Sequence, residues 1–146
     1  MDGYEFKTVD KNGRVAIPAD FRKELGDEFV ITLSGEHCIK GYTVARWREI
    51  LDSAEEFDIN PRTLTRNAKT LTFDKQGRVT LPENLLEKRG LGVDREVAIV
   101  GVVSYIEIWD AAEFNASDET ESSMESVDDV FKKIAEQKRQ ARLGSK

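Results

Sequence analysis

Two short stretches of the chain carry lysine and arginine at the same spacing between apolar runs: VDKNGRVAIP at residues 9–18 and FDKQGRVTLP at residues 73–82. Lys11 and Arg14 of the first stretch are matched by Lys75 and Arg78 of the second. A lysine beside an arginine at a loop tip suits contact with phosphate, and the arginine fork also matches O6 and N7 of guanine. These four residues are therefore candidates for nucleic-acid contact.

The same stretches predict two tight turns. Gly13 and Gly77 follow the lysines and are able to take a positive φ, which a short connection between strands requires. Asp10 and Asp74 are of a residue type that accepts backbone N–H groups inside a turn. A purely structural interpretation stays open beside the binding one, in which each arginine only pairs with the aspartate of its own turn.

The repeat extends well beyond the turns and predicts the elements that position them. It covers residues 5–47 and 69–114, and each copy has the pattern strand, turn, strand, short helix, strand, turn, strand. Proline opens the short helix of each copy and glycine ends it. Four short strands cannot bury both faces of a small sheet, so we predict a mainly β fold with short helices, in which the two copies close one barrel.

Four segments follow from this pattern. Between the copies, apolar residues at helical spacing predict helices packed on the barrel, and the polar, acidic residues 115–126 predict a linker before an amphipathic helix. Glu107, between two isoleucines of the last strand, is expected on the solvent face. The expected boundaries are a first repeat at 1–48, a helical connector at 49–68, a second repeat at 69–114, and the linker and tail helix at 115–146.

Composition narrows the classes of function. The 146 residues have a net charge of −6, but eight acidic residues without a basic one lie between positions 110 and 129, so the preceding chain is nearly balanced at 16 basic against 19 acidic residues. His37 and Cys38 are the only residues of their types. We therefore expect no metal site, no cofactor and no catalysis, in a soluble protein of the cytosol.

The doubled Asp-x-x-x-Arg motif, each copy followed by Val-x-apolar-Pro, and the closing stretch GVVSYIEIWD at 101–110 resemble the MraZ family. That family is built of two tandem SpoVT/AbrB-type modules. The resemblance implies a swapped-hairpin, AbrB-like barrel and a homo-oligomeric ring, for which an octamer is one candidate. It also implies a repressor in the cytoplasm and nucleoid that binds double-stranded DNA at G-rich direct repeats upstream of the division and cell-wall genes.

The resemblance also assigns residues. The motif arginine and its neighbouring lysine match Arg14 and Lys11 in the first copy and Arg78 and Lys75 in the second, and a further arginine after Pro-x-x-aromatic matches Arg22. Leu86 stands at the place equivalent to Arg22 in the second copy, so the second turn is expected to contact DNA less. The connector is several residues shorter than the family pattern implies.

Two other classes of function remain open at this point. The same barrel type serves as the DNA-binding head of antitoxins whose tail binds a toxin, and the acidic linker and amphipathic helix suit that role. Such antitoxins resemble one copy per chain, whereas this chain has two. A barrel enzyme or a protein-binding adaptor is the third class, although the sequence offers no Gly-rich phosphate loop and no Ser/His/Asp set.

Overall fold

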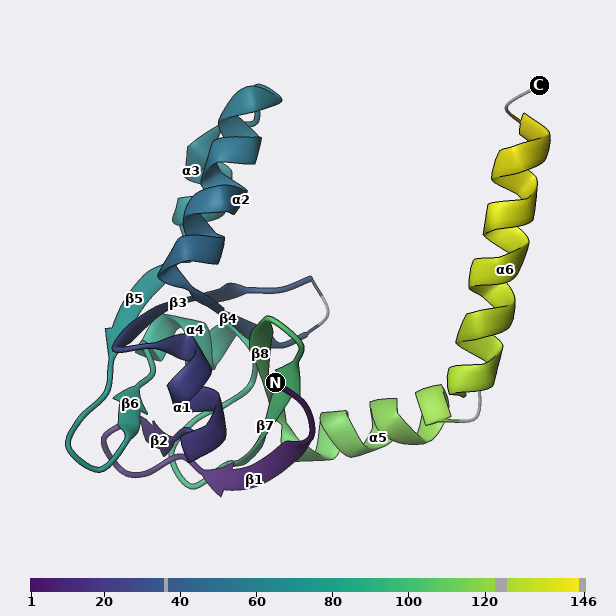
Figure 1. Cartoon of the computed structure of the whole chain (residues 1–146). Helices are drawn as coiled ribbons and strands as arrows, with labels where there is room; N and C mark the ends of the chain where they lie inside the picture. Colours follow the sequence, from purple (N-terminus) through teal and green to yellow (C-terminus); the bar gives the residue numbers. More distant parts are fainter. Residues whose placement is uncertain (36, 123–125, 145–146) are drawn as a thin grey trace. The chain divides into compact units, whose positions relative to one another are not determined.

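The computed structural model describes residues 1–35, 37–122 and 126–144. The chain divides into two compact units, Met1–Ala111 and Ala112–Lys146 (Figure 1). Across the described ranges, every helix is too short or too polar to serve as a membrane span.

The first unit contains the same five elements twice. The first copy consists of β1 (Tyr4–Thr8), β2 (Arg14–Ala16), α1 (Ala19–Leu25), β3 (Glu28–Leu33) and β4 (Ile39–Thr43). The second copy consists of β5 (Lys69–Thr72), β6 (Arg78–Thr80), α4 (Glu83–Lys88), β7 (Glu96–Val102) and β8 (Tyr105–Asp110). The order strand, strand, helix, strand, strand is the one that the repeated pattern predicts.

Strand pairing exchanges elements between the two copies. All ladders are antiparallel, and the six-stranded sheet has the order β1-β7-β8-β4-β3-β5, while β2 and β6 form a separate two-stranded ribbon. The first strand of each copy therefore lies beside the third strand of the other copy, with Lys7 opposite Val97 and Leu71 opposite Phe29. Figure 1 shows the β2–β6 ribbon at the lower left, below β3 and β4.

An approximate two-fold axis relates the copies. Val15 and Val79 are equivalent in the repeat, and they pair with each other in the β2–β6 ribbon. Lys40 and Glu107 are also equivalent, and they pair with each other between β4 and β8. Because each of these residues meets its own counterpart, the axis passes between the members of both pairs.

One hydrophobic core lies between the sheet and the ribbon. The predicted fold class is confirmed: the unit is mainly β, has short helices and is built from two interlocked repeats. Within the described residues, the ladders join the strands into two sheets that enclose the core rather than into one continuous ring. The largest fully buried side chains come from both copies: Phe29, Ile17, Ile31, Ile39, Leu85, Ile99, Ile106, Ile108, Val9, Val15, Val79 and Val97.

Two helices connect the copies, α2 (Val44–Glu56) and α3 (Pro61–Thr65). The hydroxyl of Thr43 accepts the N–H of Arg46 at the start of α2, and the side chain of Asn60 caps α3 just before its proline. Trp47 of α2 is buried and stacks on Tyr42 of β4, with ring centroids 6.2 Å apart. The connector therefore packs on the sheet, as its apolar spacing predicts.

The second unit consists of two helices, α5 (Ala111–Ser122) and α6 (Val127–Gly144). The polar segment expected to form a linker is thus helical up to Ser122, and residues 123–125 of that segment lie outside the described residues. The segment contains neither glycine nor proline, the two residue types that oppose a helix most strongly. At the start of α6, Ser126 and Asp129 exchange side-chain-to-backbone hydrogen bonds in a capping box.

Candidate functional site

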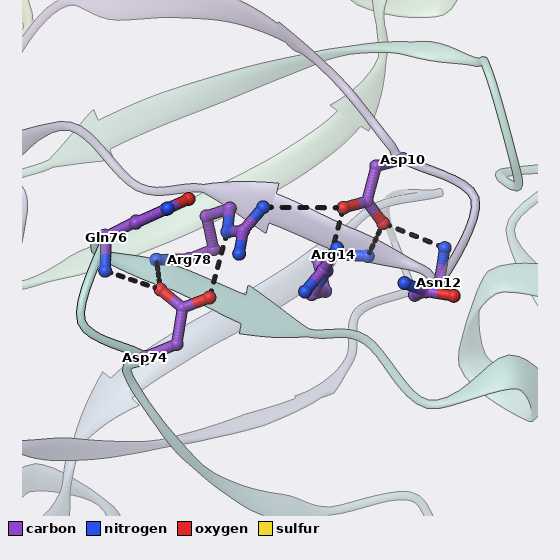
Figure 2. A network of polar contacts seen from close by, with 6 residues as sticks. All are labelled: Asp10, Asn12, Arg14, Asp74, Gln76 and Arg78. Carbon is purple, nitrogen blue, oxygen red and sulfur yellow. Dashed lines mark hydrogen bonds and ion pairs between the residues drawn. The ribbon is translucent and has the colours of Figure 1, made fainter.

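The first turn is held by a single carboxylate. Oδ1 of Asp10 accepts the backbone N–H groups of Asn12 at 2.9 Å and Arg14 at 2.8 Å, and Oδ2 accepts Nε of Arg14 at 2.8 Å (Figure 2). The backbone closes the turn with a bond from the Gly13 N–H to the Asp10 carbonyl, and Gly13 has a φ of 76°. The turn geometry and the orientation of the arginine therefore both depend on Asp10.

The second turn repeats this arrangement. Oδ1 of Asp74 accepts the N–H groups of Gln76 and Arg78 at 2.9 Å each, and Oδ2 accepts Nε of Arg78 at 2.8 Å (Figure 2). Gly77 has a φ of 77°. Each Asp-x-x-x-Arg motif is thus a closed unit in which the aspartate fixes both the backbone and the arginine, so the structural and binding interpretations of these residues are compatible.

The two arginines differ in what surrounds their outer nitrogen atoms. Nη1 of Arg78 lies 3.8 Å from Oδ2 of Asp10, so Arg78 contacts the aspartates of both turns. For Arg14, the ion pair that the structure shows is the one with Asp10. Arg14 is the better placed of the two to fork onto an external acceptor.

Hydrogen bonding shifts the titration of both aspartates. The backbone N–H of Arg14 is the main reason that the pKa of Asp10 falls below its ordinary value, and the Arg14 side chain and the Asn12 N–H add to the effect. The backbone N–H of Arg78 lowers the pKa of Asp74 in the same way. Both carboxylates are therefore charged at neutral pH, and both arginines keep their partners. Lys11 and Lys75 are exposed at the tips of the two turns.

Arg22 lies at the second turn, although the sequence places it in the first copy. Its Nη1 donates to the Ile17 carbonyl at 2.7 Å, and its guanidinium covers Gly77 so closely that a β-carbon there would lie 2.5 Å from Cζ. The structure thus groups Arg22 with Lys75 rather than with Lys11 and Arg14. The helix of one repeat reaches the turn of the other because the strands are exchanged.

Leu86 is the counterpart of Arg22, and it lies at the first turn. A β-carbon on Gly13 would lie 3.8 Å from Cδ1 of Leu86, which is itself buried. The expectation that Leu86 removes a basic neighbour from the second turn is therefore wrong, because it is the first turn that meets the leucine. Sequence reasoning also missed Lys23, which follows Arg22 on α1 and lines the same groove at the second turn. Its only signal is its place next to Arg22.

Other residues singled out in the sequence lie away from the turns. Glu107 is 9% exposed, which contradicts its expected place on the solvent face: it accepts hydrogen bonds from Cys38 Sγ at 3.7 Å and Trp109 Nε1 at 3.2 Å. Burial and the charge of Glu107 raise the pKa of the Cys38 thiol to about 12. Among the residues described, His, Cys, Asp and Glu do not gather into a group that could hold a metal ion.

Comparison with known proteins identifies the family. A family model described as "MraZ protein, putative antitoxin-like" matches residues 3–67 and again residues 64–135. Three relatives, each named "Transcriptional regulator MraZ", come from different bacteria. The protein of Limosilactobacillus fermentum is 43% identical over 71% of this chain and 76% of that protein. The protein of Halothermothrix orenii is 37% identical over 84% of this chain and 91% of that protein. The protein of Caldicellulosiruptor bescii is 36% identical over 90% of this chain and 95% of that protein.

The chain therefore belongs to the MraZ family. Among solved structures, the solution structure of PHS018 from Pyrococcus horikoshii is 20% identical, with a TM-score of 0.30, over 74% of this chain and 89% of that chain. That similarity is too low to support an argument.

Proposed function

We propose that this chain is a sequence-specific DNA-binding transcriptional regulator that acts as a repressor. The observation that carries the proposal is the pair of Asp-x-x-x-Arg turns, in each of which a carboxylate orients an arginine through a hydrogen bond from its Nε. The relatives' shared name, "Transcriptional regulator MraZ", supports the same conclusion.

In the proposed mechanism, Arg14 reads a base and Lys11 contacts the backbone beside it. An arginine fork on O6 and N7 of guanine contributes about 1 to 3 kcal/mol of discrimination against another base. Asp10 holds the side chain before DNA arrives, so little freedom is lost when the contact forms. Lys11, exposed at the turn tip, neutralises a phosphate without reading sequence.

Assembly is part of the proposal. A ring of identical chains presents the same turn several times, and direct repeats in the DNA present the same bases several times, so weak contacts multiply. This explains how a chain with a net charge of −6 binds a polyanion, because the acidic excess is concentrated in residues 110–129. The target we propose is a set of G-rich direct repeats upstream of the division and cell-wall gene cluster, in the nucleoid.

The test combines sizing with titration. The parent chain should elute as an oligomer of more than two chains and should shift a duplex carrying G-rich direct repeats. Arg14→Ala should lose specific binding and keep its melting temperature. Arg78→Ala should be milder, because Arg78 is already engaged by two carboxylates. If Arg14→Ala binds like the parent, or fails only because it unfolds, the assignment of Arg14 as the reading residue is wrong.

One observation favours a second candidate, an antitoxin that binds a toxin through its tail. Helix α6 exposes large apolar side chains, among them Val127 at 69% and Phe131 at 64%, and the matching family model is described as antitoxin-like. Co-purification of a small basic partner that is lost when Phe131 is changed to Ser would support this role. A parent chain that purifies from its own cells without any such partner would contradict the role.

A further inference from the structure

An open groove of about 670 Å³ lies between helix α1 of the first repeat and the turn of the second. The residues from α1 and the loop after it are Ala19, Arg22, Lys23, Gly26 and Asp27, and those from the second turn are Phe73, Asp74, Lys75, Gln76 and Gly77. The antiparallel pairing of β2 with β6 brings the start of α1 to the second turn, where the Ile17 N–H donates to the Gly77 carbonyl.

The groove is lined by three cationic side chains and by a carboxylate that already has an ion-pair partner. Arg22, Lys23 and Lys75 contribute positive charge, and Asp74 is neutralised by its ion pair with Arg78 at 2.8 Å. Asp27 is the remaining acidic residue of the lining. The guanidinium of Arg22 is fixed by the Ile17 carbonyl, so one of the cations is held in place while the two lysines remain exposed.

The equivalent position at the first turn has the opposite charge. The approximate two-fold axis places Leu86 where Arg22 stands, and the residue after it is Glu87 where the other copy has Lys23. Glu83 takes the place of Ala19, and both glutamates are exposed. The two turns, which have nearly the same sequence, therefore lie in different electrostatic surroundings.

From this asymmetry we infer that the groove at the second turn is a binding site for the phosphodiester backbone of DNA, and that the two turns divide the work. The second turn and α1 supply sequence-independent anchoring, while the first turn reads bases. The inference rests on the proposed function. An open, basic groove without an aromatic cage or a deep pocket suits a backbone that passes through it, whereas a small anion needs donors that converge on it.

The approximate symmetry supplies matched variants. Lys23→Glu gives the first-repeat helix the charge of the second, and Glu87→Lys gives the second-repeat helix the charge of the first. Lys75→Ala removes the lysine of the anchoring turn, and Lys11→Ala removes the matching lysine of the other turn. All four positions are exposed, so each variant keeps the core intact.

The experiment measures the affinity of the full-length chain for a duplex without G-rich repeats, by fluorescence anisotropy over a range of salt concentrations. Lys75→Ala should lower the slope of log K against log salt by about 0.9 and weaken binding roughly eightfold at 0.1 M salt. Lys23→Glu should have at least this effect. Glu87→Lys should strengthen binding to the same duplex, and Lys11→Ala should change it less than Lys75→Ala does.

Three outcomes separate the possibilities. Equal slopes for Lys75→Ala and the parent, or equal losses for Lys75→Ala and Lys11→Ala, would overturn the division of work while leaving the proposed function standing. A parent chain that binds neither this duplex nor the G-rich one would overturn the proposed function itself. Inorganic phosphate that competes with the duplex better than chloride at equal ionic strength would show a small-anion site and overturn the backbone assignment.

Discussion

Nη1 of Arg78 lies 3.8 Å from Oδ2 of Asp10, so an arginine of the second repeat shares the carboxylate that orients Arg14 of the first. Asp10 therefore links the two turns across the β2–β6 ribbon, in addition to closing its own turn. Loss of this carboxylate should therefore remove an ion-pair partner from the arginine of each motif.

The first prediction concerns the pH dependence of stability. The pKa values of Asp10 and Asp74 are lowered from 3.8 in the folded chain, so each carboxylate stabilises the fold fully above the unfolded value, and the contribution is lost as pH falls through the lower folded value. The double variant Asp10→Asn/Asp74→Asn should therefore melt below the parent at pH 7. Thermal melts below pH 4 should show this difference shrinking, and a constant difference would contradict the assignment.

The second prediction concerns the glycines of the turns. Gly13→Ala should destabilise the fold by about 1 to 2 kcal/mol, because alanine is strained at positive φ. Gly77→Ala should cost more, since its β-carbon would also meet the Arg22 guanidinium. Denaturant unfolding of the double variant Gly77→Ala/Arg22→Ala should recover part of the extra cost in a double-mutant cycle. A strictly additive cycle would show that Arg22 does not cover this turn.

The third prediction tests the packing between the copies. Gly41 of β4 faces Ile106 of β8, and a β-carbon there would lie 2.8 Å from Cγ1 of Ile106 and 3.1 Å from the ring of Phe29. Gly41→Ala should destabilise the fold by about 1 to 3 kcal/mol through overpacking. Thermal melts should show a drop of several degrees, and the drop should be smaller when Ile106 is already alanine, because alanine lacks the γ-carbon that the new β-carbon would meet. An unchanged melting temperature would contradict this packing.

The fourth prediction concerns the reactivity of Cys38. With a pKa of about 12 for the buried thiol, about one molecule in 10,000 carries a thiolate at pH 8. A disulfide-exchange reagent should therefore react with the folded chain at least about 100-fold more slowly than with the denatured chain, because the thiolate is the nucleophile. Equal rates in the two states, followed by absorbance, would show that the thiol is accessible.

The sequence predicted much of the fold because the repeat could be read from it. The order of elements, the glycine turns and the proline-opened helices all follow from local residue types, and each is present. The expectation that Leu86 leaves the second turn without a basic neighbour was wrong, because aligning the two copies shows which residues are equivalent but not which copy each helix contacts. The predicted exposure of Glu107 was wrong for a related reason. Strand alternation shows that its side chain points away from the core, but it does not show that Cys38 and Trp109 bind the carboxylate there, on a strand that lies between β7 and β4.

The exchange of strands also sets the order in which the chain is able to fold. Tyr4 of β1 pairs with Val100 of β7, 96 residues later, so β1 has no partner until nearly the whole unit has been synthesised. At about 5 to 20 residues per second, that delay is roughly 5 to 20 s. During translation, the hydrogen-bonding edge of β1 is open to other nascent chains or to chaperones. The interlocked architecture thus makes β1 the strand that waits longest for its partner during synthesis.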